Sequence, residues 1–198
     1  MTVLLTGFEP FAGESRNPSA ELAGRLSDVA RTAVLPVEFA QLQERLAALM
    51  EETQPSAVVC LGLSGAASGL TFERVAVNLV DARIPDNAGS QPVDEPVVAG
   101  GPAGYFTTLP VKAMLRAARA AGVAGELSLS AGSYACNALM YLALHAAAAV
   151  PEGSRPRCGF IHLPSEQRLP LDTQERGLRA ALGVLQAAEE HYPAGSLD

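Results

Sequence analysis

The sequence has no tryptophan, only three histidines and only three cysteines in its 198 residues. The cysteines, Cys60, Cys136 and Cys158, are odd in number and have no CxxC spacing, which disfavours both a disulfide framework and a zinc knuckle. We therefore expect reduced thiols, a cytoplasmic location and no metal site.

Basic residues are also scarce, with 14 Lys and Arg against 21 Asp and Glu and a net charge of -7. No basic run appears, so a nucleic-acid partner is disfavoured. No apolar stretch is long enough to span a bilayer. The N-terminal MTVLLTGFEPF has no positively charged leader and only a short apolar run, so we expect no signal peptide and no membrane association.

Short apolar segments alternate with segments of helical periodicity along the chain. Strands are predicted at residues 2–6, 31–39, 56–63, 72–80, 125–130 and 158–164, and helices from Asn17, at 40–52, at 111–122, from near Cys136 and at 172–191. Asn17 is a good N-cap, and Pro18 suits the first helical position. This alternation predicts one domain over 1–198, an α/β three-layer sandwich whose mostly parallel, twisted sheet is flanked by helices on both faces. Residues 81–105 are irregular, and we expect a functional or packing loop there.

Cys136 stands in SAGSYACNALMYLALH, where an apolar helix begins. The free N–H groups and the dipole of a helix start favour a thiolate, and the same N–H groups can hold an oxyanion. The alternative is an ordinary buried cysteine. Cys60, inside AVVCLGL, is interpreted as a small hydrophobic residue, and Cys158 as structural.

A cysteine nucleophile needs a base, normally histidine, and a third group that orients it. His145 follows Cys136 by nine positions on the same helix, about 180° round it and ~13 Å along it, so it faces away. His191 lies at a polar chain end. His162, near the end of the strand GFIHLP, is the best candidate, since ligands bind at the carboxyl ends of strands. The alternative is a half-buried histidine bonded to a backbone carbonyl.

Glu73 is the candidate third group. In FERVAVNL it shares a predicted strand face with Val75 and Val77, and a carboxylate on an apolar face is costly unless something pairs with it. An imidazolium would be such a partner. The alternative is a structural ion pair with Arg83 or another arginine.

Four segments, TGFEPFAGESRNPS, ERVAVNLVDARIPDN, SAGSYACN and GFIHLP, together resemble those of the pyroglutamyl peptidase I family, also called pyrrolidone-carboxylate peptidases. The resemblance implies a cysteine exopeptidase that hydrolyses the bond after an N-terminal pyroglutamyl residue through a thioester. It implies Cys136 as nucleophile, His162 as general base and acid, and Glu73 as the orienting acid.

The same resemblance implies that Phe8 and Phe11 surround the substrate's lactam ring, that Asn17 supports them, and that Arg83 lies near the active site. It also implies homo-oligomers, tetramers or dimers, peptide substrates with N-terminal pyroglutamate, and no cofactor. A neutral, flat lactam calls for aromatic faces and a few hydrogen bonds, which suits two phenylalanines in a loop. The alternative is that both phenylalanines cap the core.

The chain departs from the family's pattern in three places: GLSGAASGL lacks a common arginine, Ala12 replaces a frequent glycine, and PSEQRLPLDTQ is short. These departures bear on the loop at 64–69 and on the oligomer interface.

Two rival functions stay open. A nucleoside phosphorylase-like enzyme would need a glycine-rich phosphate loop, which is missing. A silent binding module would not need a reactive thiol.

Overall fold

The computed structural model describes residues 2–195. Six strands form its central sheet in the order β2-β1-β3-β8-β4-β7, and all neighbours run parallel except β4 and β8, which are antiparallel. This confirms the predicted α/β fold with a mostly parallel sheet. The strands are β1 (Val3–Phe8), β2 (Arg31–Leu35), β3 (Ala57–Leu63), β4 (Leu70–Glu73), β7 (Gly125–Ser128) and β8 (Arg157–Leu163).

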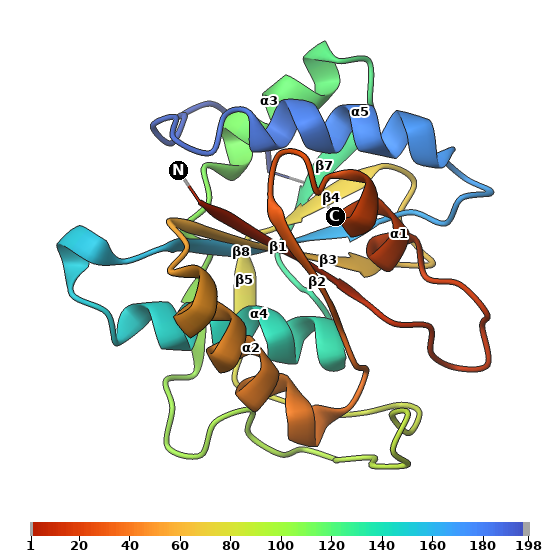
Figure 1. Ribbon diagram of the computed structural model, residues 1–198, viewed down its shortest axis with the longest axis vertical. Helices are drawn as coiled ribbons and strands as arrows, with labels where there is room; N and C mark the ends of the chain where they lie inside the picture. Colours follow the sequence, from red (N-terminus) through yellow and green to blue (C-terminus); the bar gives the residue numbers. More distant parts are fainter. Residues whose placement is uncertain (1, 196–198) are drawn as a thin grey trace.

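Helices cover both faces of this sheet and complete the three layers (Figure 1). One face carries α1 (Pro18–Arg25), α3 (Val111–Ala120) and α5 (Leu171–Leu182), and the other carries α2 (Phe39–Thr53) and α4 (Ala135–Ala148). A short 3₁₀ helix, Glu152–Ser154, joins α4 to β8. Within residues 2–195, no helix combines the length and the apolar composition that a membrane span requires.

Asn17 caps α1 as its sequence position predicts. Its Oδ1 accepts the Ser19 N–H at 3.1 Å, and Pro18 occupies the first helical position. The Asn17 Nδ2 also donates to the Glu9 carbonyl at 3.0 Å. One buried side chain thus starts the helix and holds the loop that precedes it.

The prediction of one continuous strand over 72–80 is wrong. β4 ends at Glu73, and β5 (Val75–Val77) leaves the main sheet to pair with β6 (Gly104–Phe106) in a separate antiparallel pair. The alternating pattern runs through the break, so the sequence shows no sign of it. β6 begins within the segment expected to be irregular, and the last helix ends at Leu182, not near 191.

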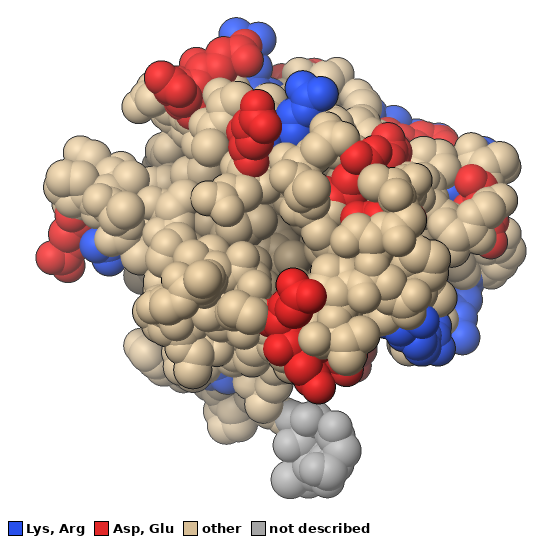
Figure 2. Space-filling model, turned by 90° about the horizontal axis from the view of Figure 1, so that it is seen from below, with Lys and Arg blue, Asp and Glu red and all other residues tan. Residues whose placement is uncertain are grey.

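Alternating side chains divide each central strand between two cores. Phe72 and Ile161 pack under α1, α3 and α5, whereas Phe160 and Cys60 pack under α2 and α4. Figure 2 views the molecule from the side of α2 and α4. On that face, acidic and basic side chains form small separate patches, and no broad basic surface is seen.

Candidate active site

Cys136 lies in the first turn of α4. The helix begins at Ala135, and the preceding Tyr134 forms no side-chain cap. The first N–H groups of a helix have no partner within the helix, so those of Cys136 and Asn137 are available to an anion. Cys136 is partly exposed and lines a cavity of about 580 Å³.

His162 and Glu73 form a buried pair in the same cavity. The His162 Nδ1 and the Glu73 Oε1 are 2.8 Å apart, with side-chain exposures of 10% and 2%. Because Thr71 lies opposite His162 in the antiparallel β4–β8 pair, alternation puts Glu73 on the same face of the sheet. The structure thus joins Glu73 to a histidine and not to Arg83.

The charge state of His162 follows from its neighbours. Burial by itself would lower the pKa of His162, but interaction with Cys136, and then with the Glu73 carboxylate, raises that pKa to about 10. The Glu73 Oε2 is buried without a hydrogen-bond partner among the described residues, so the imidazole is the carboxylate's main anchor. This arrangement favours the imidazolium form of His162 beside Cys136.

The other two thiols are in different surroundings. Cys60 and Cys158 are both fully buried in the core. Burial raises the pKa of Cys60 to about 12 and raises that of Cys158 still more. Both thiols therefore stay protonated and unreactive near neutral pH, which leaves Cys136 as the candidate nucleophile.

The other two histidines lie away from Cys136 in the structure. The His145 Nδ1 lies 2.8 Å from the Tyr105 hydroxyl, and its ring stacks on Tyr141. Neither His145 nor His191 lines the cavity. His162 is the histidine that the structure places beside the thiol.

The four predicted substrate contacts divide into two pairs. Phe11 and Arg83 line the cavity, and the Phe11 ring lies 6.2 Å from that of Tyr134. Phe8, 2% exposed, packs inside the core and does not line the cavity. Asn17, 4% exposed, holds the loop behind Phe11.

Gly62 is a site residue that the sequence analysis missed. It lies on β3 opposite His162, and a Cβ there would approach the Cys136 Sγ to 2.9 Å and the Phe160 ring to 2.6 Å. Only glycine leaves room for the thiol at this point. The available signal was a glycine inside an apolar strand, which often marks a close approach.

Asn137 and Asp86 were also missed, and both position the wall of the site. The fully buried Asn137 side chain accepts from the Val77 N–H at 2.9 Å and donates to its carbonyl at 2.9 Å. Asp86 accepts the Phe39 N–H at 2.8 Å, which ties the loop containing Arg83 to the start of α2. The sequence signal that could have identified them is a polar residue in an unusual place: Asn137 lies in an apolar helix, and Asp86 lies in a loop.

The segment at 64–69, where the family's pattern is broken, forms part of the cavity wall through Ser64, Ala66 and Ala67. Arg168, from the short segment after His162, donates to the Ala66 carbonyl at 3.1 Å. An arginine outside the altered loop thus supports its backbone.

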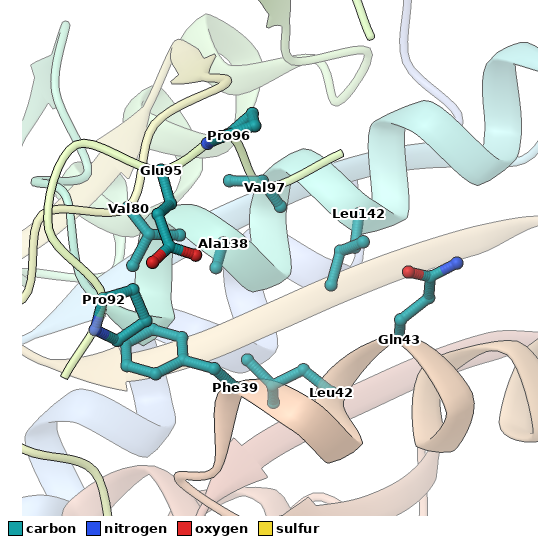
Figure 3. Close-up of a pocket in the computed structure, with 10 residues that line it drawn as sticks. All are labelled: Phe39, Leu42, Gln43, Val80, Pro92, Glu95, Pro96, Val97, Ala138 and Leu142. Atoms are coloured by element: carbon teal, nitrogen blue, oxygen red, sulfur yellow. The ribbon is translucent and has the colours of Figure 1, made fainter. Parts of the chain in front are cut away.

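A second hollow, of about 120 Å³, lies between α2, α4 and the segment at 80–97 (Figure 3). Its lining is mostly apolar, including Phe39, Leu42 and Leu142, and Glu95 is the one ionisable group among the described residues that line it. A single carboxylate without a titratable partner offers no acid–base pair. This hollow therefore does not compete with the cavity that holds Cys136 as a candidate active site.

Comparison with known proteins shows which family this chain belongs to. A family model described as pyroglutamyl peptidase matches residues 1–186. The chain belongs to the pyroglutamyl peptidase family. It is 46% identical over 184 residues to the pyrrolidone-carboxylate peptidase of Clavibacter michiganensis subsp. michiganensis, covering 90% of this chain and 85% of that one. It is 47% identical over 196 residues to that of Pseudomonas fluorescens, with 91% and 90% covered.

Solved structures of this family share the fold. The crystal structure of Bacillus amyloliquefaciens pyroglutamyl peptidase I superimposes with a TM-score of 0.90 at 36% identity, covering 96% of this chain and 99% of that one. Pyrrolidone carboxyl peptidase from Pyrococcus furiosus gives 0.88 at 37% identity, with 94% and 98% covered. The chain is thus a cysteine-type peptidase of the pyroglutamyl peptidase family.

Proposed function

We propose that this chain is an exopeptidase that removes the N-terminal pyroglutamyl residue from peptides. The observation that carries the proposal is the thiol at the start of α4 in one cavity with a buried His162–Glu73 pair. Membership of the pyroglutamyl peptidase family supplies the substrate class.

In the acylation step, the Cys136 thiolate attacks the carbonyl that follows the lactam ring, while His162 holds the proton. The negative charge that develops on the carbonyl oxygen is stabilised by the N–H groups at the start of α4, with Arg83 close by. His162 then gives its proton to the leaving amine, and a thioester on Cys136 remains.

In the deacylation step, His162 takes a proton from water, which attacks the thioester and releases pyroglutamate. Glu73 keeps the imidazole in one orientation, and its negative charge stabilises the imidazolium in both steps. Because Glu73 occupies Nδ1, Nε2 is the nitrogen that exchanges protons with the thiol and the substrate.

The lactam is neutral, so its site needs apolar faces more than charge. Phe11 and Tyr134 provide aromatic surface on the side of the cavity formed by the loop after β1. Phe8 and Asn17 contribute indirectly, because they anchor that loop to the core and to α1.

The direct test is hydrolysis of a pyroglutamyl-linked fluorogenic amide by the wild type and by Cys136→Ser, with the matching prolyl amide as control. We expect cleavage by the wild type alone and little turnover of the prolyl amide, which lacks the lactam carbonyl. No cleavage by a folded, reduced wild type would contradict the proposal and favour a binding module.

We propose further that the chain forms one domain and assembles as a homotetramer or homodimer. The two-stranded β5–β6 unit carries exposed apolar side chains, Val77 and Phe106, the latter 69% exposed, and suits burial against a second copy. Light scattering after size exclusion tests the assembly, and a monomeric mass would contradict it.

A cytoplasmic location also stays part of the proposal, since Cys60, Cys136 and Cys158 are free thiols.

A further inference from the structure

Four residues form a row across the sheet beside the thiol. Gly62 on β3 pairs with His162 on β8, His162 pairs with Thr71 on β4, and Thr71 pairs with Glu126 on β7. Residues paired in this way point to the same face of a sheet. Cys136 lies over Gly62, so the row leads from the thiol past the base to a carboxylate.

The proposed reaction predicts on which side of the thiol each part of the substrate lies along this row. His162 must protonate the leaving amine, so the peptide beyond the scissile bond lies on the His162 side of the thiol. Phe11 follows β1, which lies on the other side of β3 in the strand order. The lactam therefore extends toward the β1 side, and the departing peptide extends over Thr71 toward Glu126.

Glu126 lies where it can contact that peptide. It lies two strand spacings, about 10 Å, from His162 across the sheet, within reach of a long side chain on the next residue. Its carboxylate is exposed, lines the catalytic cavity and accepts a 3.4 Å contact from the Thr71 hydroxyl. Among residues 2–195, none forms an ion pair with Glu126.

Two cations line pockets that Glu126 also lines, and they limit the size of the effect. Arg83 lines the same cavity but comes from the loop after β5, not from the row on the sheet. Arg74 lines an adjoining hollow together with Glu126. Neither is ion-paired with Glu126 in the described chain, so the carboxylate is free to attract a substrate cation.

We propose that Glu126 is a specificity-determining residue that binds the side chain after the pyroglutamyl residue and favours lysine or arginine there. This assignment rests on the proposed function, and it identifies the side chain after the pyroglutamyl residue as the part of the substrate that Glu126 contacts. Because the contact is exposed, its effect is modest, about two- to fivefold in kcat/KM, and it weakens as salt screens the charges.

The experiment compares three pyroglutamyl dipeptide amides, with lysine, norleucine or glutamate after the pyroglutamyl residue, by chromatographic measurement of the released amino-acid amide at low and high salt. Norleucine matches the length of lysine without its charge. The variants are Glu126→Gln, Glu126→Lys and a matched control, Glu152→Gln, which makes the same charge change in the short 3₁₀ helix outside the cavity. Thermal melts verify folding.

For the wild type at low salt, we expect kcat/KM to fall in the order lysine, norleucine, glutamate. Glu126→Gln should reduce the lysine-to-glutamate ratio about two- to fivefold, Glu126→Lys should invert it, and Glu152→Gln should leave it unchanged. An identical ratio in the wild type and in folded Glu126→Gln and Glu126→Lys, with all amides cleaved, overturns the assignment alone. Failure of the wild type to cleave any of the three overturns the proposed function and the assignment with it.

Discussion

The two faces of the central sheet follow the same alternating pattern but end in different surroundings. On the face under α1, α3 and α5, the side chains of β3, β4 and β8 are apolar, as with Leu61, Phe72 and Ile161. On the face under α2 and α4, the apolar core of Phe160 and Cys60 gives way to polar residues at the strand ends.

The difference arises from where the helices begin. α4 begins beside the row that contains Gly62 and His162, since Cys136, in its first turn, would lie 2.9 Å from a Cβ at Gly62. One face of the sheet thus carries a continuous apolar core, and the other carries an apolar core along most of its length and the candidate active site at one end. Variants that separate activity from stability test this division.

The largest effect is expected for Cys136→Ala. Loss of the nucleophile should lower kcat/KM for a pyroglutamyl amide by about 10⁴-fold or more, with little change in folding. The matched control is Cys60→Ala, which removes a thiol from the same face of the sheet. Cys60→Ala should lower stability but keep the activity per folded molecule, and an equal loss in both variants would contradict the assignment.

The next largest effect is expected for Glu73→Gln. Loss of the carboxylate should lower kcat by about 10²- to 10⁴-fold, because the imidazolium is no longer stabilised. Since Glu73 also raises the pKa of His162, the alkaline limb of the kcat/KM profile should move to lower pH. A pH–rate series measures both, and an unshifted alkaline limb would argue against this role of Glu73.

Gly62→Ala tests the close approach between the strand and the thiol. Its Cβ would lie 2.9 Å from the Cys136 Sγ, so displacement of the thiol should cost about 10²-fold in kcat/KM. Gly177→Ala on α5 is the counterpart on the other face, where a Cβ would lie 2.8 Å from Leu70 and Val123. Gly177→Ala should cost about 1–3 kcal/mol of unfolding free energy, with kcat/KM per folded molecule unchanged. Denaturant titration and kinetics on both variants show whether the effects separate.

The pH dependence of stability provides a smaller effect. The pKa of His162 is raised from 6.5 to about 10 in the fold, so its contribution is fully present below about pH 6.5 and is lost as pH rises through about 10. The free energy of unfolding should therefore fall over this range in the wild type. His162→Gln should remove that part of the slope, and Cys136→Ala should reduce it. Equal slopes in all three proteins would contradict the coupling.

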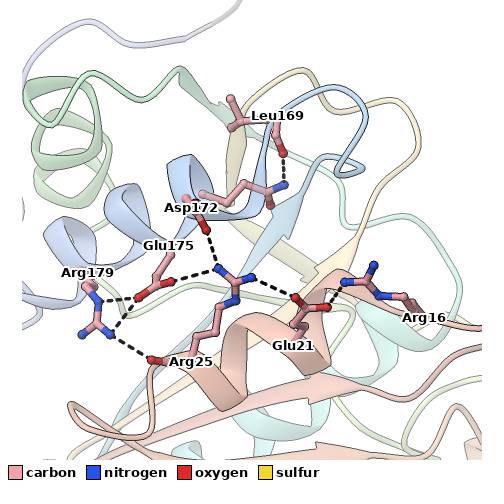
Figure 4. A network of polar contacts seen from close by, with 8 residues as sticks. Arg16, Glu21, Arg25, Leu169, Asp172, Glu175 and Arg179 are labelled. Atoms are coloured by element: carbon pink, nitrogen blue, oxygen red, sulfur yellow. Dashed lines mark hydrogen bonds and ion pairs between the residues drawn. The ribbon is translucent and has the colours of Figure 1, made fainter.

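The smallest effect is expected from the ion pairs that join α1 to α5 (Figure 4). Arg25 contacts Glu21, Asp172 and Glu175, the Asp172 contact being 2.7 Å. Because these groups all reach solvent, Arg25→Gln should lower the melting temperature slightly, less at high salt, and leave kcat/KM unchanged. A change in kcat/KM would show that the two faces are coupled.

Local patterns predicted most elements and failed where the chain changed direction. Asn17 and Pro18 identify the start of α1, because a cap acts within a few residues. The alternation over 72–80 predicted one strand, whereas the chain leaves the sheet after Glu73. The face-sharing argument for Glu73 therefore rested on a strand that breaks, yet Glu73 still contacts His162, because Thr71 pairs with His162 and Glu73 lies on the same face of β4 as Thr71.

By itself, the sequence determined the fold class, the family resemblance and the candidate thiol and histidine, because hydrophobic periodicity, helix caps and the scarcity of histidine are local or countable properties. Only the tertiary structure decided that Gly62 makes room for the thiol, that Phe8 is buried in the core and does not line the cavity, and that Glu126 completes a row from the thiol to β7. These facts depend on strand order and register, which bring together residues far apart in the chain, and no local pattern encodes them.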